Sequence, residues 1–266
     1  MSLLEAALLG LVEGLTEYLP VSSTGHLVLA SHFLGQDAEA SAAFDIVIQL
    51  GAILAVVVQY RALLAERARG LLRRDAKAQR LLVALALGFL PAAVTGLVLR
   101  KTIKAHLFGP TPVALALIVG GVVMIVAERL MKGRAQANDS VDDVTPKRAL
   151  IIGGMQCLAM WPGASRSMCT ILGGQVAGLS TKTAAEFSFL LGLPTLGAAT
   201  LYEAYKSKDV LFADGAVMPL VVGLVVSFFV AWAVIAAFIR YLSRRGLEPF
   251  GVYRIALGIL VLLLVR

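Results

Sequence analysis

The sequence predicts an all-α polytopic membrane protein with six transmembrane helices and two re-entrant helical hairpins in an inverted-topology repeat. The chain of 266 residues is 59% hydrophobic and only 15% charged, with a mean hydropathy of +0.84, whereas soluble domains carry about 25% charged residues. Its apolar residues come in unbroken runs rather than in the periodic stripes of half-buried helices. Two further apolar segments are interrupted in the middle by proline and hydroxyl residues.

Six apolar runs are long enough to cross a bilayer, because a helix needs about 20 apolar residues to span a hydrocarbon core of about 30 Å. We expect these spans at residues 43–60, 81–99, 111–130, 184–205, 216–240 and 250–265. The chain is therefore expected to lie within the membrane along most of its length.

The two interrupted segments, residues 3–34 and 148–179, each read as two half-length helices. In the first, a helix to Leu19 is followed by a break at Pro20, and in the second the break begins at Pro162. Proline ends a helix and leaves backbone groups unpaired, which a membrane tolerates only where protein or a wet cavity satisfies them. Both segments are therefore expected to be re-entrant hairpins that meet near the midplane.

A hairpin followed by three spans occurs twice, so the single membrane domain divides into a first repeat over 1–130 and a second over 146–266. Because each repeat has three spans, the second enters the membrane from the opposite side. The connections at 61–80, 129–148 and 240–245 carry fifteen Lys and Arg, against six on the other side. The excess predicts that these connections are cytoplasmic and that both chain ends face the periplasm or cell exterior.

The net charge of +7 does not indicate a nucleic-acid partner. The basic residues lie in short connections between apolar runs, where membrane topology explains them, and not on one face of a helix. We expect the lipid bilayer as the surroundings and no nucleic acid as a partner. The sequence leaves open whether the chain forms a homodimer.

The first broken segment contains two glutamates at helical spacing. Glu13 and Glu17 are four residues apart, so they share one face of a helix. A charge at the bilayer centre costs at least about 2.5–3.5 kcal/mol, and two close carboxylates share a proton or bind a cation. The pair predicts a divalent-cation site, with simple solvation at the interface as the alternative.

Hydroxyl residues and a histidine follow Pro20. Ser22, Ser23 and Thr24 stand beside Gly25, where they can cap the returning helix, and free N–H groups at a helix start favour a phosphate. His26 suits proton transfer or nucleophilic attack on phosphorus. The alternatives are capping alone for the hydroxyls and a satisfied core position for the histidine.

The second broken segment places Arg166 in an otherwise apolar stretch. Its planar guanidinium matches a phosphate with two parallel hydrogen bonds. The alternative is a structural ion pair with Glu13 or Glu17, and Glu186 is a further candidate partner. Together the two motifs supply the parts that phosphoryl transfer needs. The groups expected to bind phosphate are Ser22, Thr24, Gly25, Gly163, Ser165, Arg166 and Ser167.

These residues resemble a known family. The stretches Glu13–His26 and Pro162–Ser167, with Phe44–Leu54 and Glu186–Leu190, are similar to the bacterial undecaprenyl pyrophosphate phosphatases along essentially the whole chain. The resemblance implies hydrolysis of undecaprenyl diphosphate, a polyprenyl diphosphate lipid, to the monophosphate carrier for peptidoglycan synthesis. It also implies a location in the bacterial inner membrane, bacitracin resistance, and an inverted repeat with two re-entrant hairpins.

The resemblance also implies roles for individual residues. By motif position, the catalytic residues are Glu17, His26, Ser23 and Arg166, and the supporting residues are Glu13, Ser165 and Ser167. The glutamates are associated with Mg²⁺ or Ca²⁺, and the nucleophile is left open between a serine and the histidine. One departure is that Met168 follows the Ser-Arg-Ser motif where the family has glycine, which puts close backbone approach to a phosphate there in doubt.

A transporter is the alternative from another functional class. Inverted repeats with broken helices are typical of transporters, and the same arginine and glutamates could bind a polyprenyl phosphate headgroup without chemistry. The feature that favours hydrolysis is His26 with its hydroxyl neighbours, because binding alone needs no proton carrier. A lipid phosphatase of the phosphatidic acid type shares fragments of these motifs but not their spacing.

Overall fold

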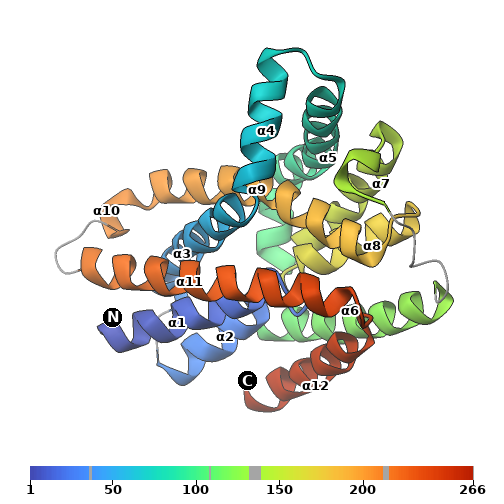
Figure 1. Ribbon diagram of the computed structural model, residues 1–266. Coiled ribbons are helices and arrows are strands. Elements are labelled where there is room, and N and C mark those ends of the chain that lie inside the picture. The colour runs from blue at the N-terminus through green and yellow to red at the C-terminus, as the bar shows by residue number, and fades with distance from the viewer. Residues whose placement is uncertain (36–37, 108, 132–138, 212–215, 266) are drawn as a thin grey trace.

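The computed structural model describes residues 1–35, 38–107, 109–131, 139–211 and 216–265, and this part of the chain is helical without strands. Figure 1 shows how the helices are arranged. The α-helices are α1 (Leu3–Thr16), α2 (Ser23–Phe33), α3 (Ala38–Gln59), α4 (Arg61–Leu72), α5 (Ala76–His106), α6 (Pro110–Leu130), α7 (Pro146–Gln156), α8 (Arg166–Val176), α9 (Thr181–Lys206), α10 (Lys208–Leu211), α11 (Val217–Leu242) and α12 (Glu248–Leu264). Two short 3-10 helices are η1 (Val141–Asp143) and η2 (Cys157–Met160).

The predicted all-α polytopic membrane protein is confirmed. Within the described residues, four helices are long and apolar enough to cross a membrane: α5 over its first 24 residues, α6, α9 and α11. A fifth is obtained if α3 and α4, which meet at a bend of 73°, count as one span. α12 coincides with the sixth predicted run but has only 17 residues. The arrangement of six spans and two re-entrant hairpins therefore stays a prediction.

Large apolar side chains cover the outside of these helices. On α5, Val94, Leu97 and Val98 are 58%, 84% and 73% exposed, and Phe229 on α11 is 58% exposed. Contiguous apolar surface of this kind is rare on soluble monomers. It is the surface that lipid tails would cover.

α4 was predicted only as part of the connection 61–80. The chain turns at Tyr60 and continues as a helix that carries three arginines and has no fully buried residue. Nη2 of Arg67 donates to both carboxylate oxygens of Asp142, at 2.8 and 2.7 Å. This pair fixes α4 to η1, in the linker between the two halves of the chain.

Both predicted breaks are present. α1 ends at Thr16, earlier than the predicted Leu19, and the chain turns before α2 begins at Ser23. The early end follows from Pro20, whose ring would clash with the carbonyl of Thr16 in a continued helix and which disfavours helical backbone at the residue before it. In the second half, α7 is followed by η2, and α8 begins at Arg166.

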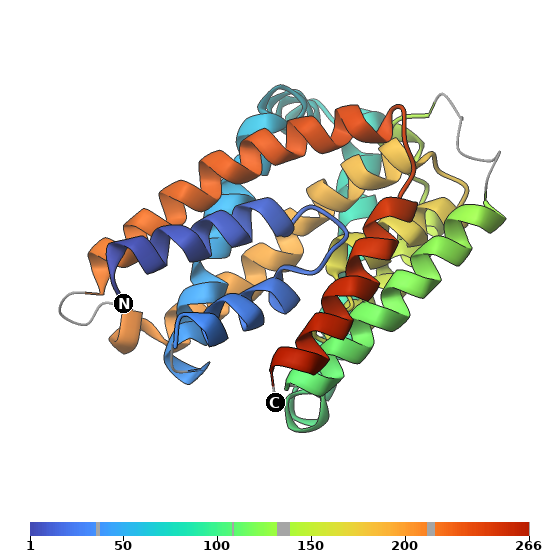
Figure 2. The same ribbon diagram turned by 90° about the horizontal axis from the view of Figure 1, so that it is seen from below.

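The helices pack so that each break lies inside the protein. α1 lies alongside α11, and α6 alongside α12, in both views of the molecule (Figures 1 and 2). Figure 2 shows the loop between α1 and α2 in the middle of the molecule rather than at its edge. The breaks are therefore enclosed by the other helices, as unpaired backbone in a membrane requires.

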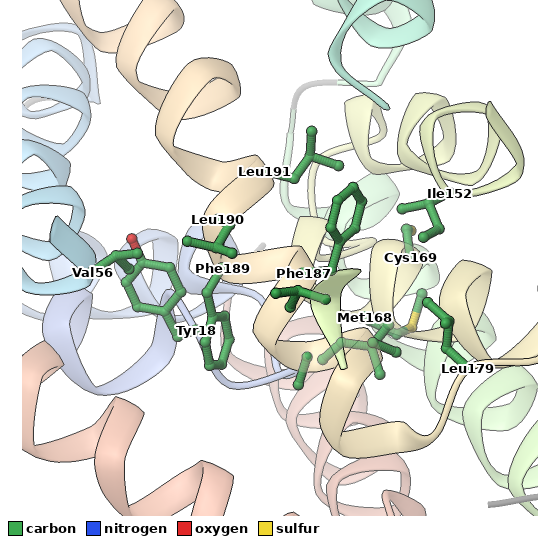
Figure 3. Packing of buried hydrophobic residues seen from close by; sticks show 14 of the residues in the cluster. Tyr18, Val56, Ile152, Met168, Cys169, Leu179, Phe187, Phe189, Leu190 and Leu191 are labelled. Atoms are coloured by element: carbon green, nitrogen blue, oxygen red, sulfur yellow. The ribbon is translucent and has the colours of Figure 1, made fainter. Parts of the chain in front are cut away.

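The main core lies between α8, α9 and the helices around them. Phe187 and Phe189 of α9 are fully buried, and the ring of Tyr18 meets Phe189 edge-on at 5.1 Å between centroids (Figure 3). Met168 and Cys169 belong to the same cluster. The side chain of Met168, which departs from the family pattern, therefore packs into the core.

Close helix packing generates a stability prediction at two adjacent glycines of α7. A Cβ atom at Gly153 would lie 2.6 Å from the carbonyl oxygen of Gly88 on α5, whereas a Cβ at Gly154 would meet nothing within 4 Å. We expect Gly153→Ala to lower the free energy of unfolding by about 1–3 kcal/mol through overpacking. Gly154→Ala should raise it by up to about 1 kcal/mol through helix propensity.

Thermal unfolding of both variants in the same detergent measures the difference. Equal melting temperatures for the two variants would contradict the close contact between α5 and α7.

Candidate active site

The two loops repeat the same unusual backbone conformation. Ser22, before α2, has φ 70° and ψ 99°, and Ser165, before α8, has φ 73° and ψ 115°. Each Oγ accepts a hydrogen bond of 3.3 Å from the backbone N–H three residues later, at Gly25 and Met168. A non-glycine residue in this region costs of order 1–3 kcal/mol. Two strained serines therefore start two helices of equal length.

The two loops meet at a cavity of about 140 Å³. This volume holds several water molecules or a phosphate group. The start of α2 and the start of α8 both contribute to its wall, where free N–H groups and the helix dipole favour an anion. Its lining residues are Glu17, Ser22, Ser23, Thr24, Gln49, Ala159, Pro162, Gly163, Ser165, Arg166 and Leu196.

Glu17 joins the two loops at this cavity. Its Oε2 accepts a hydrogen bond of 2.7 Å from Oγ of Ser23, and its Oε1 lies 3.3 Å from Nη2 of Arg166. The side chains of Glu17 and Arg166 are only 6% and 8% exposed. Of the partners considered for Arg166, the structure selects Glu17, whereas Glu186 lies 4.0 Å from Lys182.

Arg166 is held in place by the core. Its Nη1 donates to the carbonyl oxygen of Ser188 at 2.8 Å, and its guanidinium lies over the ring of Tyr18 at 5.6 Å from the centroid. Gly192 leaves room for the guanidinium, since a Cβ there would lie 3.2 Å from Nη1. Its Nε has no hydrogen-bond partner within the described part of the chain. The fork is thus fixed in position with donor capacity to spare for an anion.

Two of the predicted phosphate ligands do not line the cavity. Ser167 is fully buried, and its Oγ donates to the carbonyl oxygen of Leu19 at 2.8 Å, while lying 3.0 Å from Oγ of Ser165. Gly25 is buried against Leu117. In this structure Ser167 connects the second loop to the first, and the N–H of Gly25 donates to the capping hydroxyl of Ser22.

His26 is not among the lining residues of the cavity either. Its Nδ1 lies 2.8 Å from the carbonyl oxygen of Ser22 and therefore carries the proton. Its Nε2 then accepts from the hydroxyl of Tyr253, at 2.7 Å, and the two rings are stacked at 5.6 Å. The histidine is thus joined to the strained serine on one side and to α12 on the other.

Glu13 is not among the residues that line the cavity. It is fully buried, and neither carboxylate oxygen has a hydrogen-bond partner in the part that the structure describes. Oδ1 of Asp45 is likewise buried and without a partner there. Such orphaned oxygens fit a bound proton or a cation. The described residues contain no group of three or more His, Cys, Asp or Glu able to hold a metal, so a cation would need further ligands.

Sequence reasoning missed the residues that hold the motifs in place. Gln49 lines the cavity and Ser188 fixes Arg166. On α12, Tyr253 contacts His26 of α2, and Arg254 contacts the first loop. Arg254 had a usable signal, because an arginine within the apolar run 250–265 is as exceptional as Arg166. Gln49 and Ser188 lie in the stretches 44–54 and 186–190 that carry the family resemblance, but no role was assigned to either residue.

The arrangement has the parts needed to bind and cleave a phosphate ester or anhydride. A fixed guanidinium and two helix starts can hold the phosphate oxygens, and a carboxylate bonded to a hydroxyl forms a base and nucleophile pair. The burial of Glu17, Ser23 and Arg166 strengthens the electrostatic interactions that they make.

Comparison with known proteins agrees with this chemistry. The family model described as bacitracin resistance protein BacA matches residues 6–260. A relative from Sorangium cellulosum named undecaprenyl-diphosphatase is 61% identical over 260 residues, covering 97% of this chain and 85% of the relative. Relatives of the same name from Nitrosomonas eutropha and Nitrosomonas europaea are each 49% identical over 261 residues, covering 98% of this chain and 94% of each relative. The chain therefore belongs to the BacA family of bacitracin resistance proteins.

Proposed function

We propose that this membrane phosphatase hydrolyses undecaprenyl diphosphate to undecaprenyl phosphate and inorganic phosphate. The observation that carries the proposal is the position of Glu17, bonded to Ser23 of its own loop and to Arg166 of the other at the wall of one cavity. The names of the relatives support hydrolysis and give the transport alternative no support. By recycling the lipid carrier, the enzyme would contribute to bacitracin resistance.

The substrate would be held at both ends. The polyprenyl tail stays in the bilayer against the apolar surface of the helices, and the diphosphate enters the cavity between the loops. Arg166 and the N–H groups at the starts of α2 and α8 bind its oxygens. Binding the diphosphate in a site that excludes bulk water favours charge stabilisation in the transition state.

Ser23 is the nucleophile that the geometry favours. Its Oγ donates to Glu17 at 2.7 Å and faces the cavity. Glu17 takes the proton as Oγ forms a bond to the terminal phosphorus, and the bond from that phosphorus to the bridging oxygen breaks. Undecaprenyl phosphate leaves with the electron pair, and water then hydrolyses the phosphoserine.

Glu13 and Glu17 would hold a divalent cation, Mg²⁺ or Ca²⁺, together with oxygens of the substrate. When bound, this ion offsets the negative charge of the diphosphate. The orphaned carboxylate oxygens of Glu13 support this assignment.

His26 has a positioning role in this proposal. Its Nδ1–H bond to the Ser22 carbonyl holds the first loop in its strained conformation, next to Ser23.

The site opens to the periplasmic side of the inner membrane, a proposal supported by the distribution of Lys and Arg among the connections.

The direct test is phosphate release from undecaprenyl diphosphate by the purified protein in detergent. We expect release that a chelator abolishes and Mg²⁺ or Ca²⁺ restores. Arg166→Ala should remove at least about 99% of the activity, since loss of one oriented charge donor costs about 100- to 1000-fold. Arg240→Ala, on the exposed face of α11, is the control and should match wild type.

No release by folded wild-type protein would contradict the proposed function. Retention of a tenth of the activity by Arg166→Ala would contradict the role given to Arg166.

A second prediction concerns the nucleophile. Acid quenching during turnover of substrate labelled in the terminal phosphate should trap label on Ser23 as acid-stable phosphoserine, identified by mass spectrometry of the peptide. Ser23→Ala should show neither label nor turnover, whereas Ser31→Ala, on the same helix, should show both. Full turnover by Ser23→Ala, or label only on His26 in a parallel alkaline quench that preserves phosphohistidine, would rule out the serine.

A further inference from the structure

We propose that Arg254 of α12 is a positioning residue that holds the two loops of the site at a fixed separation. The inference rests on the proposed function for its effect on catalysis. Arg254 lies outside both sequence motifs, 234 residues from Pro20. It is the largest fully buried side chain in the described part of the protein.

Arg254 donates hydrogen bonds to three separate segments of backbone. Its Nη1 donates to the carbonyl oxygen of Pro20 in the first loop at 3.2 Å. Its Nη2 donates to the carbonyl oxygen of Gly163 in the second loop at 2.9 Å and to that of Ala116 on α6 at 3.2 Å. One rigid guanidinium thus connects both loops to the pair formed by α6 and α12.

The two loop carbonyls occupy corresponding positions. Pro20 precedes Ser22 by two residues, and Gly163 precedes Ser165 by two residues. Ser22 and Ser165 share the same strained backbone and the same capping hydrogen bond. Arg254 therefore binds the same carbonyl of each loop, at the place that determines where α2 and α8 begin.

The chemistry of the contact calls for arginine. Three carbonyl acceptors in different directions match the flat fork of a guanidinium, whereas the ammonium of lysine is a single point donor. A buried cation is costly, and among the described residues no carboxylate lies within ion-pair distance of Arg254. An apolar side chain would fill this buried position at a lower free-energy cost than a charged one. The hydrogen bonds that hold the two loops are therefore the reason for an arginine at this position.

α6 is shaped to receive this side chain. A Cβ atom at Gly120 would overlap Nη2 of Arg254, so only glycine leaves the guanidinium in its place. A substitution of Gly120 by alanine would therefore displace the guanidinium of Arg254 without removing its charge.

Displacement of the loops should reduce kcat strongly. Ser23 is the first residue of α2 and Arg166 the first residue of α8, each directly after its loop, so their separation depends on how the loops are held. A misplacement of about 1 Å far from the chemistry can cost about 100-fold in rate. A residue with a merely structural role would lower stability and leave the turnover of the folded molecules unchanged.

The experiment measures two independent quantities on the full-length protein in detergent. The first is kcat and KM for phosphate release, normalised to folded, monodisperse protein. The second is the distance between spin labels at Phe33→Cys and Val176→Cys, exposed positions at the far ends of α2 and α8, with Cys157 replaced by serine. The label distance reports how the two helices lie relative to each other, whether or not the protein hydrolyses the lipid.

Arg254→Lys is expected to lower kcat about 100-fold, with a far smaller change in KM, and to shift or broaden the label distance. Arg129→Lys is the matched control, because Arg129 also joins α6 to α12, through Glu248, without touching either loop. It should leave both quantities at wild-type values.

Gly120→Ala tests the same contact with the arginine retained. We expect it to reproduce both effects of Arg254→Lys, the lower kcat and the changed label distance. If Arg254→Lys cannot be purified as folded protein, Gly120→Ala alone tests the role of Arg254. Gly154→Ala is its control, because it is also a glycine-to-alanine change in a helix but its Cβ would meet nothing within 4 Å, and it should leave both quantities at wild-type values.

A wild-type label distance in folded Arg254→Lys or Gly120→Ala overturns the inference, as does wild-type kcat in either variant. Absence of phosphate release by wild-type protein would count against the proposed function alone, because the label distance still tests the role of Arg254.

Discussion

The ion pair between Glu17 and Arg166 is the interaction on which the site depends. It joins residues 149 positions apart in the sequence, at 3.3 Å, in a place where both side chains are more than nine-tenths buried. Removing one partner of a buried pair leaves an uncompensated charge at a cost of about 3–5 kcal/mol. Each half of the chain thus needs the other, and the cavity exists only where both loops are present.

The sequence predicted the fold class and the breaks because both follow from the bilayer. Long apolar runs must be helical in lipid, and a proline with hydroxyl residues inside such a run must be enclosed. The same constraint singled out Glu17 and Arg166, since charges in apolar segments are expensive. The structure places Glu17, Ser23, Ser165 and Arg166 at one cavity.

Other features depend on three-dimensional packing that spacing does not encode. The connection after α3 folds as α4 and is fixed by the pair of Arg67 with Asp142, whereas the end of α1 at Thr16 follows locally from Pro20 and was open to prediction. The sequence motifs also did not predict the direction in which each side chain points. His26 turns to Tyr253, and Ser167 to the Leu19 carbonyl, although both belong to the motifs. Ser188 became a ligand of Arg166 only through the packing of α8 on α9.

The most direct test of a single site built from two halves is a double-mutant cycle on kcat/KM, with Glu17→Gln, Arg166→Gln and the double variant. Residues that act as one unit show strongly non-additive losses. If the two loops form one site, the double variant should lose no more activity than the worse single variant. Losses that multiply would mean that Glu17 and Arg166 act independently, which would contradict the account.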